Sequence, residues 1–149
     1  MDAAIAFAQL ATRLRYEDLP APAIDVTKKD ILDTLGTTLA GTTGEGAEEL
    51  VELARELGGK PESSIINYGI KVPSPMAAVV NGFIARSVDY DDTYEAAVLH
   101  AGATVISAAF ACAERRGGIS GKEFITAVAL GIDMICRMGL AKQEGRAAG

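Results

Sequence analysis

The sequence has no tryptophan, one histidine and two cysteines among its 149 residues, and aromatic residues make up only 5% of it. Cys112 and Cys136 are far apart and lack a C-x-x-C spacing, which argues against a zinc site or a disulfide framework. We expect both to be small buried hydrophobic residues in a reducing compartment, which indicates the cytoplasm. The Walker A, G-x-S-x-G and G-x-G-x-x-G motifs are also absent, so the common nucleotide-binding and serine-hydrolase signatures are excluded.

Positive charge is also scarce, since 14 lysine and arginine residues stand against 20 aspartate and glutamate residues, a formal net charge of -6. Nucleic-acid binding requires clustered basic residues, so a small molecule or a protein is the expected partner. The uncharged run Ala101–Ala113 is too short to span a bilayer. Asp2 stands where a signal peptide would carry positive charge, so neither export nor membrane insertion is indicated.

What is present is mostly helical periodicity, interrupted by residues that start or stop helices. A short stretch rich in β-branched and aromatic residues, interrupted by Gly69, predicts a strand or hairpin near 63–72. The chain is therefore predicted to be all-α, a multi-helix bundle forming a single domain over residues 1–149. The predicted helices cover residues 2–14, 22–39, 47–57, 74–88, 102–114 and 120–138.

Three local features make this prediction specific. The helix over 22–39 is expected to bury an apolar stripe, and the buried amide of Asn81 is expected to bond to a neighbouring backbone, with ligand contact as the alternative. Ser120 and Glu123 form a capping-box pattern at the start of the last helix. The residues expected to form the stripe are Ile24, Ile31, Leu35 and Leu39.

The segment SVDYDDTYEAAVLHAG, residues 87–102, gathers four carboxylates and the only histidine. If the preceding helix continues through it, Asp89, Asp92 and Thr93 share one face. Acidic residues at a helix C-terminus repel the helix dipole and one another, which favours a functional site. Two alternatives remain open. An acidic surface loop has the same composition. Asp-rich turns also hold Mg²⁺ or Ca²⁺, although Tyr94 replaces the glycine of an EF-hand loop and we predict no metal site.

His100 stands immediately before a predicted helix start. The free N–H groups there, which include those of Gly102 and Ala103, could bind an anion. A histidine beside such a site and near an aspartate is suited to general acid or base catalysis. A purely structural role for this side chain remains an equal alternative.

Three stretches resemble the N-terminal part of the MmgE/PrpD family: DILDTLGTTLAG (30–41), SPMAAVVNGFIARSVDYDDT (74–93) and HAGATVISAAFACAE (100–114). The similarity runs from about residue 3 to residue 141. It implies an all-helical domain of enzymes that act on small polycarboxylates, such as 2-methylcitrate dehydratase, cis-aconitate decarboxylase and an iminodisuccinate epimerase. It also implies proton transfer next to carboxylates without an obligatory metal or organic cofactor.

Carried onto the matching positions, the resemblance makes His100 a proton-transferring residue and places Asp89 and Thr93 in the substrate pocket. Asp89 is also expected to be catalytic, by holding a substrate hydroxyl or the imidazole ring in place. Asp92 is a candidate catalytic residue that would orient the histidine. The helix start at Gly102 and Ala103 would then accept a substrate carboxylate.

The resemblance further implies that the chain is an N-terminal fragment of a longer architecture that includes a lid domain. We therefore expect part of a cofactor-independent lyase, most like 2-methylcitrate dehydratase. Activity like that of cis-aconitate decarboxylase or iminodisuccinate epimerase is the first alternative, and a non-catalytic assembly module or truncated paralogue is the second. Such a chain would leave an apolar face for a homo-oligomer, such as a homodimer, or for a complementing chain.

Overall fold

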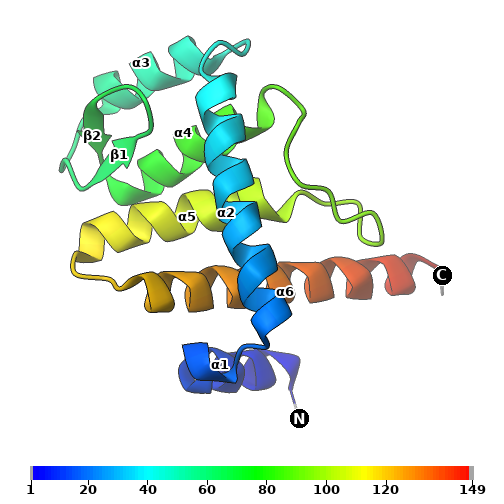
Figure 1. Cartoon of the computed structure of the whole chain (residues 1–149). Helices are drawn as coiled ribbons and strands as arrows, with labels where there is room; N and C mark the ends of the chain where they lie inside the picture. Colours follow the sequence, from blue (N-terminus) through cyan, green and yellow to red (C-terminus); the bar gives the residue numbers. More distant parts are fainter. Residues whose placement is uncertain (1, 148–149) are drawn as a thin grey trace.

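A computed structural model of the chain describes residues 2–147 as helices joined by loops and one hairpin (Figure 1). The prediction of a mostly helical bundle with one short hairpin is confirmed. The elements are α1 (Ala3–Arg13), the 3₁₀ turn η1 (Tyr16–Asp18), α2 (Ala21–Gly41), α3 (Ala47–Leu57), β1 (Ser63–Ile65), β2 (Ile70–Val72), α4 (Ser74–Arg86), α5 (Ala101–Arg116) and α6 (Gly121–Ala147).

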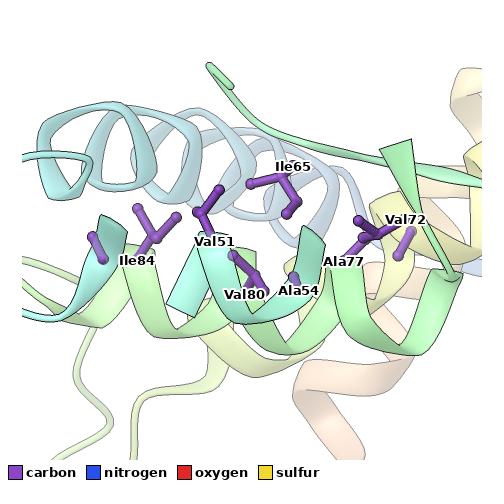
Figure 2. Packing of buried hydrophobic residues seen from close by; sticks show 9 residues of the cluster. Val51, Ala54, Ile65, Val72, Ala77, Val80 and Ile84 are labelled. Atoms are coloured by element: carbon purple, nitrogen blue, oxygen red, sulfur yellow. The ribbon is translucent and has the colours of Figure 1, made fainter. Parts of the chain in front are cut away.

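The hydrophobic core lies between α3, α4 and the β1–β2 hairpin (Figure 2). Its side chains are small or β-branched, which allows the helices to approach closely. Val51, Ile65, Val80 and Ile84 have at most 1% of their surface exposed. The antiparallel strands pair Ser63 with Val72, and this short sheet covers one end of α4.

Asn81 joins the hairpin to α4, as predicted. Its side-chain oxygen accepts a hydrogen bond from the Ile66 N–H at 2.9 Å, and its amide donates to the Ser64 carbonyl at 3.0 Å. The side chain is 1% exposed. The buried amide therefore satisfies its hydrogen bonds within the protein, and the structural interpretation is confirmed.

Helix α2 crosses α4, α5 and α6 (Figure 1), but the predicted stripe is wrong in part. Leu39 is 52% exposed, and no member of the stripe is fully buried. The hydroxyls of Thr37 and Thr38 donate back to the Thr34 carbonyl, so these side chains can be buried without an external partner. The buried face of α2 instead consists of Thr27, Thr34, Thr37, Thr38 and Gly41.

The helix ends follow the sequence signals. The Asp2 carboxylate accepts from the Ala4 N–H at 2.9 Å. Ser120 and Glu123 form the predicted capping box, because the Glu123 carboxylate accepts from the Ser120 N–H and the Ser120 hydroxyl accepts from the Glu123 N–H. Both caps satisfy amides that a helix start leaves unpaired.

Few residues of the two terminal helices are fully buried. None of the residues of α1 is buried. By length and composition α6 could cross a membrane, with a mean hydropathy of 1.7 over Gly121–Lys142 and 6% of that window buried. The same features are typical of a helix that packs inside a larger assembly. Cys112 is exposed, so the expectation that it is buried is wrong, whereas Cys136 is half-buried.

Candidate active site

Arg86 ends helix α4, and the acidic segment that follows is a loop, not a continuation of the helix. Asp89 and Val98 have positive φ angles of 55° and 50°, which no helix permits. Tyr94 and Leu99 form an isolated antiparallel bridge that closes the loop before α5 begins. The prediction that Asp89, Asp92 and Thr93 share a helical face is therefore wrong.

Two of the predicted residues lie at the outer edge of this loop. The Asp89 side chain is 83% exposed and accepts a hydrogen bond from Arg86 at 2.9 Å. Thr93 is also exposed. Within the described part of the chain, no hydrogen bond joins either residue to His100. The catalytic role of Asp89 and the substrate-binding role of Thr93 stay predictions.

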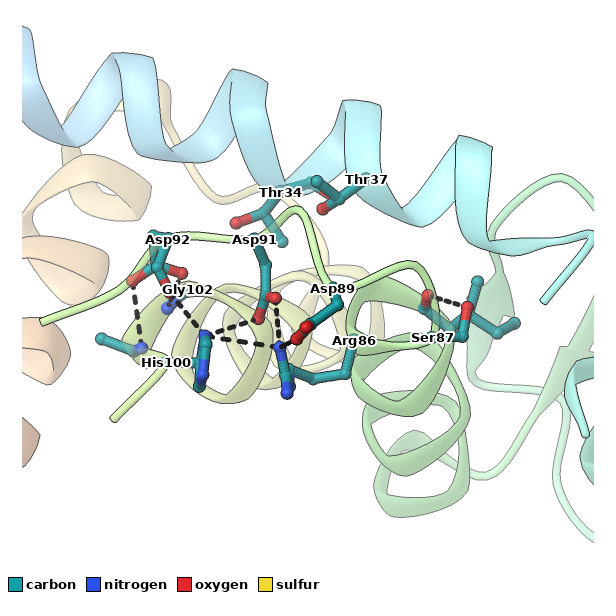
Figure 3. A network of polar contacts seen from close by, with 11 residues as sticks. Thr34, Thr37, Arg86, Ser87, Asp89, Asp91, Asp92, His100 and Gly102 are labelled. Carbon is teal, nitrogen blue, oxygen red and sulfur yellow. Dashed lines mark hydrogen bonds and ion pairs between the residues drawn. The ribbon is translucent and has the colours of Figure 1, made fainter. Parts of the chain in front are cut away.

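Asp91, which the sequence analysis did not select, is the buried carboxylate of the cluster (Figure 3). Its side chain is 0% exposed, with Oδ1 2.5 Å from Arg86 Nη1 and Oδ2 3.4 Å from His100 Nδ1. Oδ2 is buried and has no hydrogen-bond partner. A buried carboxylate needs a cation. The sequence signal that could have identified Asp91 was therefore Arg86, five residues earlier at the end of an apolar helix.

Asp92 caps helix α5. Its carboxylate accepts from the Ala101 N–H at 3.0 Å and from the Gly102 N–H at 2.8 Å (Figure 3). The helix start that we expected to hold a substrate carboxylate is thus occupied by a carboxylate of the chain itself. Ala103 is 2% exposed. An external anion would have to displace Asp92, and the binding roles of Gly102 and Ala103 stay predictions.

Gly102 is required at this point for close packing. A Cβ atom there would lie 2.5 Å from Asp92 Oδ1 and 2.6 Å from Thr34 Oγ1. The Thr34 hydroxyl is buried without a hydrogen-bond partner. Helix α2 and the acidic loop therefore meet over the first turn of α5.

His100 is held through one ring nitrogen. Nδ1 lies 2.8 Å from the Asp92 carbonyl oxygen, which can only accept a hydrogen bond, so Nδ1 carries the hydrogen. In the neutral ring the lone pair is then on the other nitrogen, Nε2, which the ring places on the side away from Asp91 and Asp92 (Figure 3). The side chain is 32% exposed. This arrangement presents Nε2 as a base.

The electrostatics around the loop follow from this packing. The hydrogen bond to Asp91 raises the pKa of Arg86, so this guanidinium stays charged. Burial, followed by the nearby charges of Asp92 and Asp33, raises the pKa of Asp30. Burial and then the charge of Asp92 also raise the pKa of Cys136. The fixed cation beside the histidine is therefore Arg86.

Arg86 also lines an open groove of about 350 Å³ between α4 and α5. The remaining wall is formed by small side chains: Ala78, Val79, Gly82, Ala103, Thr104 and Ala108. His100 is not among the residues that line this groove. Two other grooves, of about 190 Å³ and 470 Å³, lie along α6 and include neither Arg86 nor His100. Over the described residues, no group of three or more His, Cys, Asp or Glu side chains has the arrangement of a metal site.

The fold and this loop define a helical domain that presents a histidine beside an Arg–Asp ion pair. Residues 5–148 match the family model of the MmgE/PrpD N-terminal domain, and the chain therefore belongs to this family. The family resemblance inferred from the sequence is confirmed, and a lyase-like family is supported.

Three curated relatives are similar to the chain. A cis-aconitate decarboxylase-like protein, oryM, of Aspergillus oryzae is 29% identical over 87% of this chain and 28% of its own length. Human cis-aconitate decarboxylase is 30% identical over 89% of this chain and 28% of its own length. Mouse cis-aconitate decarboxylase is 27% identical over 94% of this chain and 29% of its own length. The chain thus spans less than a third of the length of these relatives.

Proposed function

We propose that this chain supplies a proton-transferring histidine to a cofactor-independent lyase that acts on a small polycarboxylate. The observation that carries the proposal is the placement of His100. Its ring is fixed through Nδ1, its Nε2 lies away from the polar cluster, and Arg86 beside it provides a fixed positive charge. A proton-transferring group next to a cation suits proton transfer on a carboxylate substrate.

The chemistry of the site accommodates two reactions. In a decarboxylation, the C–C bond to the leaving CO₂ breaks, its electron pair stays on the substrate carbon, and protonated Nε2 of His100 gives that carbon a proton. In a dehydration like that of 2-methylcitrate dehydratase, Nε2 takes a proton from carbon while a second acid protonates the leaving hydroxyl. The cis-aconitate decarboxylases among the relatives favour the first reaction for this chain.

The proposal includes a division of roles. Arg86 Nη1 is bonded to Asp89 and Asp91, and the arginine side chain is 39% exposed, so its outer edge is available to a substrate carboxylate in the α4–α5 groove. His100 would act on the atom next to that carboxylate. Further groups, including the second acid of a dehydration, would come from outside residues 1–149.

Thermal unfolding with and without citrate or cis-aconitate tests this proposal. A ligand at 100 times its dissociation constant stabilises a protein by about 2.7 kcal/mol, which raises the Tm of a chain of this size by about 5–10 °C. We expect this rise in the unmodified chain and in Lys28→Gln, which removes an exposed cation elsewhere. His100→Gln should fold but lose most of the rise. An equal rise in His100→Gln would contradict the proposal.

A second candidate function, a helical assembly module, is favoured by the exposure of the terminal helices. Helix α1 has no buried residue, and most apolar residues of α6 are only half-buried. We propose that these surfaces pack against a second copy or a complementing chain. Tight self-association in sedimentation, together with no stabilisation by either acid, would favour the module over the lyase.

Because both cysteines are free, a reducing cytoplasm is the proposed location.

A further inference from the structure

We propose that Asp91 is a positioning residue that determines which nitrogen of His100 carries the proton. Its catalytic meaning rests on the proposed function, because the tautomer with hydrogen on Nδ1 makes Nε2 the nitrogen that takes up and releases the proton. The positioning itself is a property of the folded chain and can be measured without a substrate.

The first step is the hydrogen count on Arg86. Its Nη1 has two hydrogens, and two carboxylates use them: Asp89 Oδ1 at 2.9 Å and Asp91 Oδ1 at 2.5 Å. The third neighbour, His100 Nδ1, lies 3.4 Å away. With both hydrogens committed, Arg86 does not donate to the ring, and the ring nitrogen is free to donate to the Asp92 carbonyl.

The second step concerns the other oxygen of Asp91. Oδ2 faces His100 Nδ1 at 3.4 Å and has no other partner. A carboxylate oxygen accepts and never donates, so it favours hydrogen on Nδ1, as does the Asp92 carbonyl. Because the Asp91 side chain is fully buried, water does not compete with it in the intact chain.

Removing the carboxylate reverses both effects. In Asp91→Asn, the amide oxygen faces the arginine, because its NH₂ group would oppose another donor, and that NH₂ group then faces Nδ1. In Asp91→Ala, a hydrogen of Arg86 Nη1 is released 3.4 Å from Nδ1. A hydrogen bond from a cation is about twice as strong as a neutral one, so it outcompetes the bond to the Asp92 carbonyl. In both variants Nδ1 becomes an acceptor and Nε2 carries the hydrogen.

The test uses the fact that His100 is the only histidine of the chain. The ¹⁵N chemical shifts of its two ring nitrogens, recorded at alkaline pH, report the tautomer without any assignment problem. We expect predominantly Nδ1–H in the unmodified chain and predominantly Nε2–H in Asp91→Asn and Asp91→Ala. Circular dichroism selects the folded variants, and either of the two is sufficient.

Asp89→Asn is the matched control, because Asp89 contacts the same arginine nitrogen but its side chain is 83% exposed. It should leave the histidine predominantly Nδ1–H, since water can accept the released hydrogen. An unchanged tautomer in the folded Asp91 variants, or the same change in Asp89→Asn, would overturn the inference. If citrate and cis-aconitate fail to stabilise the unmodified chain while the tautomer changes as expected, the proposed function fails and the positioning role stands.

Discussion

Replacement of Gly102 by alanine tests the tightest contact of the candidate site. The added Cβ would meet Asp92 Oδ1 at 2.5 Å and Thr34 Oγ1 at 2.6 Å, well inside ordinary contact distance. Neither neighbour can yield easily. Asp92 is fixed by two amides at the start of α5, and Thr34 is 2% exposed.

The expected cost combines two effects. Overpacking costs about 1–3 kcal/mol, and displacement of a capping carboxylate about 1 kcal/mol. We therefore expect Gly102→Ala to lose about 2–4 kcal/mol of unfolding free energy, which lowers the Tm by about 5–15 °C for a chain of this length. Urea and thermal unfolding followed by far-UV circular dichroism measure both quantities.

Gly36→Ala provides the control, because it is the same substitution inside helix α2 and nothing lies within 4 Å of the added atom. It should gain up to about 1 kcal/mol from helix propensity. Thr34→Ala should restore part of the stability of Gly102→Ala, since it removes one of the two colliding oxygens. If Gly102→Ala is as stable as the unmodified chain, the packing derived for this junction is refuted.

Two further substitutions test other contacts. Asn81→Ala should lose about 2–4 kcal/mol of unfolding free energy, measured by urea unfolding, because it leaves the Ile66 N–H and the Ser64 carbonyl unpaired in the interior. A loss below about 0.5 kcal/mol, the size of a typical surface effect, would contradict this prediction. Because the pKa of Asp30 is raised in the folded chain, stability is lost as pH rises from its unfolded value of 3.8 through the folded value. Asp30→Asn should therefore be more stable than the unmodified chain at neutral pH but not below pH 3.8, and equal stability at both pH values would exclude the burial effect.

The elements predicted best from the sequence are those set by local chemistry. The capping box at Ser120 depends on two side chains three residues apart, and the hairpin depends on β-branched residues around a glycine. Asn81 was predicted correctly because a buried amide must find partners, and the nearest unpaired backbone is the hairpin.

The acidic loop could not be predicted in the same way. Spacing rules relate side chains only where the backbone repeats regularly, and this backbone changes direction at Asp89, with φ of 55°. The periodicity thus grouped Asp89 with Thr93, whereas the loop buries Asp91. The apolar stripe predicted for α2 was wrong in part for a related reason. A threonine whose hydroxyl bonds to its own helix can take the place of a leucine on a buried face.

Asp92 fixes the geometry of the site through both its side chain and its backbone carbonyl. Its carboxylate holds the first two amides of α5, and its carbonyl oxygen receives the Nδ1 hydrogen of His100, which is the residue immediately before that helix. One residue therefore fixes both the start of the helix and the orientation of the imidazole. Gly102 is the position at which the Asp92 carboxylate packs directly against the helix. Asp91 and Arg86 then act on a ring that is already anchored, so under the proposed function the loop that collects acidic residues would organise a base before any substrate arrives.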